Sequence, residues 1–208
     1  MNQTKRLRPL FLQDLTAYYL SLHDFFSSVG GFPASKMTLH MLILIASGPP
    51  EVLLQHEQTP LYHSFKTKLK ELIEQTYRSF VTGALNTLPA AQKAFYDDGA
   101  PKAAFYCPTK LNEPIDQWDF YPRFISKKDF ITPHSFYQAF FAYKELSAWV
   151  EIVDALFRSA TTTDELNLLS IHNENPVLLY LYFQRLIETS HIVYIRHGLG
   201  YATLNSNR

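Results

Sequence analysis

Apolar residues recur along the chain mostly at steps of three and four, the period of an α-helix with one buried face. The clearest runs cover residues 60–84, residues 133–161 and a stretch that begins at Pro176. Thr59, Thr132 and Asn175 precede these runs, and each is followed by a proline, whose missing N–H does no harm in a first helical turn. The pattern therefore predicts three long helices that begin at these points.

Shorter helices are predicted over residues 10–26, 36–46, 51–57 and 164–171. Gly30 and Gly31 end the first of these, and Ser35 is a candidate cap for the second. Residues 191–195 either prolong the last long helix or form a short extended segment, because β-branched side chains favour strand geometry. Residues 177–183 contain no polar side chain except two tyrosine hydroxyls, which predicts that this part lies at the centre of the fold.

Residues 88–131 break this helical pattern, because they are dense in both proline and aromatic residues. A loop of this length inside a compact domain is uncommon and tends to be functional. We expect a largely irregular insertion whose aromatic rings either plug the helix bundle or form one wall of a binding cleft. The whole chain, residues 1–208, is then one all-α domain of about six or seven helices, with a flexible basic end at residues 1–9.

Composition and charge exclude several classes of protein. The chain has 208 residues, 47% of them hydrophobic, with 19 basic and 19 acidic side chains. This balance argues against a surface that binds nucleic acid or an anionic membrane as a whole. Cys107 is the single cysteine, so an internal disulfide is excluded.

The start of the chain is similar to a signal peptide, because the basic residues Lys5, Arg6 and Arg8 precede apolar residues. Gln13 and Asp14 interrupt the apolar run, and no small-residue cleavage pattern follows. The longest uninterrupted apolar stretch is residues 41–46, or residues 37–46 if Thr38 and His40 are tolerated. Either is shorter than the roughly 20 residues that cross a bilayer. We therefore expect a soluble cytoplasmic protein with no membrane partner.

Arg185 and His191 match the Arg-(four to six residues)-His pattern of HEPN-domain ribonucleases, which are small helical bundles that often act as dimers. The resemblance implies metal-independent RNA cleavage, in which His191 moves a proton and Arg185 neutralises the charge that develops on the phosphate. Six residues on a regular helix turn two side chains about 120° apart, so the pair would converge only if the helix bends near residues 189–190. Glu188 lies three residues from both and is a candidate partner for each.

Glu188 and His191 also form a Glu-x-x-His pair, a spacing that di-iron helical bundles use twice. None of the other seven histidines has a glutamate three residues before it. We therefore expect no metal site and no cofactor.

A polar and aromatic set in the insertion, formed by Trp118, Asp119, Tyr121 and Arg123, is able to recognise a peptide or a planar ligand. The alternative is that Arg123 stacks on neighbouring rings and pairs with an Asp. Nucleophile elbows and phosphate-binding glycine loops are absent from the sequence. The sequence thus favours a non-catalytic helical module that binds another protein or a small apolar ligand, and a homo-oligomer is compatible with it. The alternative is the ribonuclease.

Overall fold

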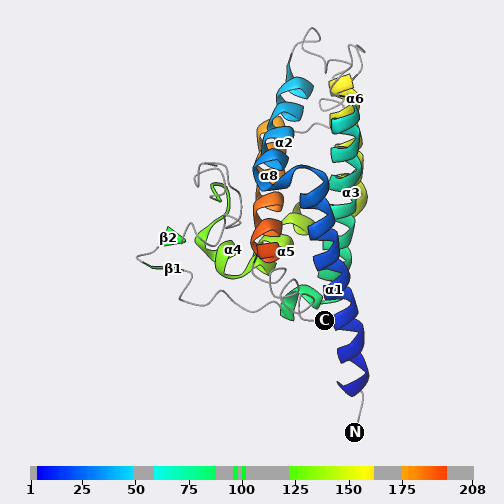
Figure 1. Ribbon diagram of the computed structural model, residues 1–208, viewed down its shortest axis with the longest axis vertical. Helices are drawn as coiled ribbons and strands as arrows, with labels where there is room; N and C mark the ends of the chain where they lie inside the picture. Colours follow the sequence, from blue (N-terminus) through cyan, green and yellow to red (C-terminus); the bar gives the residue numbers. More distant parts are fainter. Residues whose placement is uncertain are drawn as a thin grey trace.

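The fold is all-α, as predicted (Figure 1). The computed structural model describes residues 4–48, 59–87, 96–97, 100–101, 122–161 and 175–195. In these ranges the α-helices are α1 (Thr4–Ser28), α2 (Gly31–Ser47), α3 (Thr59–Val81), α4 (Lys127–Ile131), α5 (Pro133–Tyr143), α6 (Leu146–Thr161) and α8 (Pro176–Val193). A 3-10 turn, η3 (Ala84–Thr87), follows α3, and the two-residue strands β1 (Tyr96–Asp97) and β2 (Ala100–Pro101) pair antiparallel.

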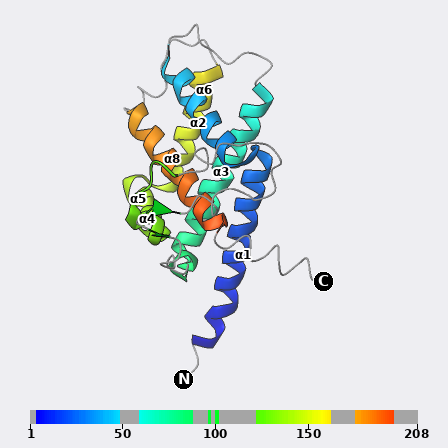
Figure 2. The ribbon, with the colours of Figure 1, turned by 60° about the vertical axis from the view of Figure 1, so that its left-hand side comes forward.

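Two layers of helices form the bundle. Helix α1 packs on α3, α3 also packs on α6, and α2 packs between α6 and α8. Helix α5 covers the other side of α8, with the short α4 beside it. The amino-terminal part of α1 projects beyond the bundle (Figures 1 and 2).

Aromatic rings from the helices fill the core. The largest fully buried side chains are Trp149, Tyr18, Tyr137, Phe25, Phe65, Phe136, Phe140 and Phe183. They come from α1, α3, α5, α6 and α8, so the helices themselves supply a continuous aromatic core. The prediction that rings of the insertion plug the bundle falls mostly on residues outside the described ranges.

The three proline-marked helix starts are confirmed, since α3, α5 and α8 begin at Thr59, Pro133 and Pro176. Asn175 caps α8, because its Oδ1 accepts hydrogen bonds from the amides of Val177 and Leu178. Helix α3 ends at Val81, earlier than residue 84, and Gly83 follows with a φ of 75°. These starts depend on local chemistry, which explains why the sequence predicts them.

The turn between α1 and α2 differs in extent from the prediction. Gly30 and Gly31 have φ of 81° and 90°, a backbone region that favours glycine. Helix α2 begins at Gly31. Pro33 lies in its first turn, where a proline is tolerated, so it does not delay the start of the helix. Ser35 caps nothing, since its hydroxyl donates to the carbonyl of Phe32. Helix α1 begins at Thr4, so most of the basic end predicted to be flexible is helical.

The predicted single helix over residues 133–161 is wrong, because it breaks at Lys144 and Glu145 into α5 and α6. Trp149 stacks on Phe140 with ring centroids 4.1 Å apart, and its indole N–H donates to the Phe140 carbonyl. Nine residues on a straight helix would separate these rings by about 13 Å. The break lets α6 fold back, so that the indole reaches both the ring and the end of α5.

Helix α8 also corrects a prediction. The stretch 177–183, expected at the centre, exposes Val177 and Leu181, and only Leu179 and Phe183 are buried in it. The central part lies further along, where Gln184, Glu188, Thr189, Ser190 and His191 are all buried. Their burial is tolerated because several of them have internal hydrogen-bond partners. The Ser190 hydroxyl lies 3.5 Å from the Tyr137 hydroxyl, and the Tyr137 hydroxyl lies 2.7 Å from the Tyr18 hydroxyl.

Helix α4 lies at the end of residues 88–131, the insertion that the sequence predicts to be largely irregular; most of this insertion lies outside the described residues. Ser126 caps α4 by accepting a hydrogen bond from the Asp129 amide, and donates its own hydroxyl to the Asp129 carboxylate. The helices predicted over residues 51–57 and 164–171 lie outside the described residues. Within the described part of the chain, no single helix has both the length and the apolar character to cross a membrane. Only α1 and α2 taken together, as a pair bent by 71°, meet both criteria.

Candidate functional site

A groove of about 510 Å³ lies between α2, α8 and residues 122–126, a segment that we call the strap. The groove is lined by Pro33, Ala34, Lys36, Met37 and His40 of α2, by Arg123 and Phe124 of the strap, and by Tyr180 and Gln184 of α8. Its size falls within the range of known ligand pockets, roughly 300–1,000 Å³.

The buried carboxylate of Glu188 fixes the strap to α8. Its Oε1 accepts hydrogen bonds from the amide of Arg123 at 2.9 Å and from the Lys36 ammonium at 2.5 Å. Its Oε2 accepts from the amides of Phe124 at 2.7 Å and Ile125 at 3.2 Å. Four donors thus surround a side chain with no exposed surface, which is what a buried carboxylate requires. We call this arrangement the Glu188 clamp.

Lys36 connects the clamp to the groove. Its ammonium lies 5.0 Å from the ring centre of Phe32 and 5.5 Å from that of Phe124, both within cation–π range. The amide nitrogen of Gln184 donates to the Lys36 carbonyl, while none of the described residues donates a hydrogen bond to its buried side-chain oxygen. The clamp therefore holds α2, the strap and α8 together at the base of the groove.

A chain of rings crosses the groove from the strap to α2. Phe124 meets Tyr180 edge to face with centroids 5.5 Å apart, and Tyr180 meets His40 in the same way at 5.6 Å. Burial, followed by the nearby Glu188 carboxylate, raises the pKa of the Tyr180 phenol. Tyr180 therefore stays neutral at physiological pH and keeps a hydroxyl proton that can be donated.

Two of the described residues that line the groove carry charged side chains, Lys36 and Arg123. The Lys36 ammonium is paired with the buried Glu188 carboxylate, so this pair adds no net charge to the groove. The other described lining residues have apolar, aromatic or amide side chains.

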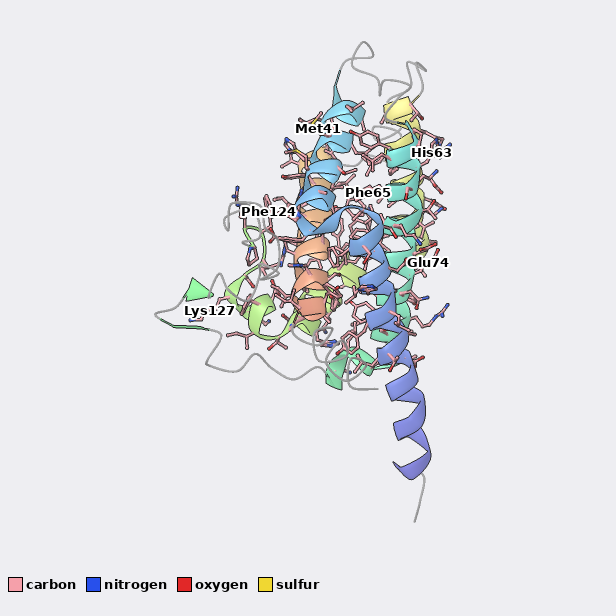
Figure 3. The ribbon with its side chains drawn as sticks, viewed as in Figure 1. Met41, His63, Phe65, Glu74, Phe124 and Lys127 are labelled. Carbon is pink, nitrogen blue, oxygen red and sulfur yellow. The ribbon has the colours of Figure 1, made fainter. Side chains whose placement is uncertain are left out.

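An exposed apolar surface continues from the groove along α2 and α8. It consists of Met37, Met41 and Leu44 on α2 and Val177 and Leu181 on α8, with 62%, 39%, 53%, 67% and 37% of their surface exposed. The two helices run antiparallel here, since Lys36 contacts residues 184 and 188 while His40 contacts residue 180. Figure 3 shows Met41 and Phe124 on the same side of α2. We call these five residues the apolar face.

The structure brings one member of the predicted binding set to this groove. Arg123 lines it, whereas Trp118, Asp119 and Tyr121 lie outside the described residues. Tyr180 and Glu188 were not predicted as part of a binding site. Glu188 was expected to pair with Arg185 or His191, but it contacts Lys36 and the strap, more than 60 positions away in sequence. No local pattern in the sequence predicts such a contact.

Arg185, one of the two candidate catalytic residues, is part of a structural ion pair. Its guanidinium donates to the Asp129 carboxylate at 2.8 Å and lies 4.9 Å from the ring centre of Phe136. Burial alone would raise the pKa of Asp129, but hydrogen bonds from Ser126, Ser135 and Arg185 lower it. Arg185 thus holds α4 and α5 against α8.

His191, the other candidate, is buried against α1 and α2. Its ring stacks on Phe32 with centroids 4.1 Å apart and meets Phe26 edge to face. Burial, followed by the charge of Lys36, lowers the pKa of the imidazole to about 3. The imidazole is neutral and packs against different helices from Arg185, so the two do not converge on one surface.

The Glu188–His191 pair does not form a metal site either, since the clamp occupies the Glu188 carboxylate. In the ranges that the structure describes, no three His, Cys, Asp or Glu side chains are grouped so that they could hold a metal ion. Comparisons with protein-family models, with curated proteins and with solved structures found no match to this chain.

Proposed function

We propose that the chain is a non-catalytic helical binding module whose ligand or partner lies in the groove between α2, α8 and the strap. The observation that carries the proposal is the position of Arg123. The sequence indicates Arg123 as a recognition residue, and its neighbours in the groove include Phe124, Tyr180 and His40. A cation, aromatic rings and an apolar surface together match the usual composition of recognition sites.

The rigidity of the groove supports this proposal. The Glu188 clamp binds three consecutive strap amides, so Arg123 and Phe124 have fixed positions before any ligand arrives. A preformed wall reduces the entropy that binding would otherwise cost.

The environments of Arg185 and His191 support a binding role over the ribonuclease alternative. Arg185 contacts Asp129, and the His191 imidazole stacks on Phe32. Neither residue lines the groove. We expect the module to act in the cytoplasm and to bind either a protein or a small apolar molecule.

A photo-crosslinking experiment in cells tests the proposal. A benzophenone amino acid replaces Met37, at the edge of the groove, and in a matched variant replaces Val81, which is similarly exposed on α3. We expect adducts at position 37 that are absent at position 81, because only the first position borders the groove. The mass of the adduct distinguishes a protein from a small molecule.

Replacing Arg123 with Gln in the Met37 crosslinking protein serves as the control for specificity. It removes the side-chain cation but keeps the backbone amide that Glu188 binds, so the clamp is retained. We expect fewer adducts. Equal adducts at positions 37 and 81, or none at 37, would show that the groove is not a binding site.

A further inference from the structure

The methionines of this protein lie on its surface. The chain contains three, and the two that the structure describes, Met37 and Met41, have 62% and 39% of their surface exposed. Methionine is among the residue types most often buried, because its flexible thioether fills gaps in a core. The buried cluster of the described residues contains aromatic, leucine, isoleucine, valine and alanine side chains and no methionine. Both side chains are therefore accessible to solutes.

Met37 and Met41 also lie at the edge of the proposed binding site. Met37 lines the groove, and Met41 follows it by four residues, which is about one turn of α2 (Figure 3). The buried side of α2 is formed by other positions, among them Leu39, Leu42 and Ile43. A chemical change at the two methionines would thus alter the surface beside the groove while the packed side of α2 keeps its contacts.

The chemistry open to an exposed thioether is oxidation by a hydroperoxide. The sulfur lone pair attacks one peroxide oxygen, the O–O bond breaks, and the other oxygen leaves with the proton as water or an alcohol. Sulfur loses two electrons and becomes a sulfoxide, and the hydroperoxide gains them. The sulfoxide is polar and chiral, and two reductases, one for each epimer, return it to the thioether. Their reaction oxidises two thiols to a disulfide and releases the oxygen as water.

We propose that Met37 and Met41 form a reversible oxidation site, at which a hydroperoxide converts the two thioethers to sulfoxides and makes the edge of the groove polar. The effect on binding rests on the proposed function, because an apolar ligand in the groove would lose contact with hydrocarbon. Met37 reacts before Met41, since it is the more exposed of the two. Oxidation of a core methionine would disrupt the packing, whereas oxidation at these positions leaves the fold intact.

Peptide mass spectrometry of the full-length chain measures the modification. Folded and urea-unfolded protein are treated with dilute hydrogen peroxide, and the oxidation rate of each methionine is compared between them. We expect Met37 to react in the folded chain within about threefold of its unfolded rate, and Met41 to react more slowly. The oxidised protein should keep its circular dichroism and Tm, and both reductases together should restore the unmodified mass.

A double variant, Met37→Leu with Met41→Leu, serves as the matched control, because leucine is apolar and of similar volume but has no sulfur. Nile red, a neutral apolar dye, is the probe for binding. We expect peroxide to weaken dye binding to the wild type about fivefold, with recovery after treatment with both reductases, and to leave the double variant unchanged. Both proteins keep Cys107, so an effect through this thiol would appear in both.

Three results would overturn this inference. Met37 reacts more than about tenfold slower in the folded chain than in the unfolded chain; oxidation lowers the Tm or is not reversed by the reductases; or dye binding changes equally, or not at all, in the wild type and the double variant. The proposed function has a separate readout, since the absence of crosslinks at position 37 would reject the groove as a binding site without affecting the measured oxidation.

Discussion

The imidazole of His191 lies flat against the phenyl ring of Phe32, with centroids 4.1 Å apart and ring planes 8° from parallel. Phe26 covers the same imidazole edge to face. A protonated imidazole would carry a buried charge close to the Lys36 ammonium, which explains why the pKa of His191 falls to about 3. This stack therefore makes the stability of the fold depend on pH.

We expect the free energy of unfolding to decrease as the pH falls. The folded His191 stays neutral down to about pH 3, whereas in the unfolded chain it takes up a proton below about pH 6.5. Below pH 6.5 the unfolded state thus binds more protons, and the loss between pH 7 and pH 5 is about 2 kcal/mol from this group. Urea unfolding at a series of pH values measures it. In His191→Phe this contribution of about 2 kcal/mol to the loss between pH 7 and pH 5 should be absent. Parallel curves of unfolding free energy against pH for the two proteins would contradict the assignment.

Removing the Glu188 carboxylate should destabilise the fold more than a single surface change does. Glu188→Ala leaves the Lys36 ammonium and three strap amides without their acceptor, with an expected loss of about 3–5 kcal/mol in urea unfolding. Glu74→Ala, an exposed change on α3 (Figure 3), should stay within about 0.5 kcal/mol.

Hydrogen exchange separates the clamp from a general effect on stability. In Glu188→Gln, which keeps the shape of the side chain, we expect faster exchange of the Arg123, Phe124 and Ile125 amides. The amides of α3 should exchange as in the wild type. Uniform acceleration throughout the chain, or no acceleration in the strap, would argue against a specific clamp.

Trp149 should be one of the most sensitive positions of the core. Its indole is fully buried, stacks on Phe140 and donates to the carbonyl of that residue. We expect Trp149→Ala to cost about 3–5 kcal/mol, because it leaves a cavity and removes the hydrogen bond from the indole to the Phe140 carbonyl at the break between α5 and α6. Thermal unfolding followed by circular dichroism measures this loss. A cost below that of Val150→Ala, on the neighbouring position of α6, would be inconsistent with the stacking.

RNA cleavage by this chain should not depend on His191. Because the imidazole is buried and neutral and Arg185 pairs with Asp129, we expect mixed single-stranded RNA to remain intact after incubation with the purified protein. His191→Ala serves as the comparison for contaminating nucleases. Cleavage by the wild type that disappears in His191→Ala would favour the ribonuclease alternative.

The sequence predicts the starts of α3, α5 and α8 because these depend on a few neighbouring residues. Asn175 caps α8 through atoms two and three residues away, and Pro133 and Pro176 are each followed by a helix. The break before α6 was missed, since the stacking of Trp149 on Phe140 depends on how two helices fold back on each other. A periodicity argument continues a helix wherever the apolar stripe continues.

The candidate site was predicted only through Arg123. Its floor and its clamp come from residues distant in sequence, such as Lys36 and Glu188, and their pairing requires the tertiary fold. The rule that an all-apolar helix segment is buried also failed at residues 177–183, because hydropathy alone does not distinguish an exposed apolar surface from a core.

The pattern of exposed apolar and buried polar residues on α8 determines which of its positions suit protein engineering. Solubility should be improved at Val177 and Leu181, where water already reaches the side chains, by replacing hydrocarbon with charge. Replacing buried polar residues with apolar ones is a common route to higher stability. It should fail at Glu188 and Gln184, because their hydrogen bonds hold the neighbouring backbone in place. A designer guided by hydropathy alone would change the wrong half of this helix.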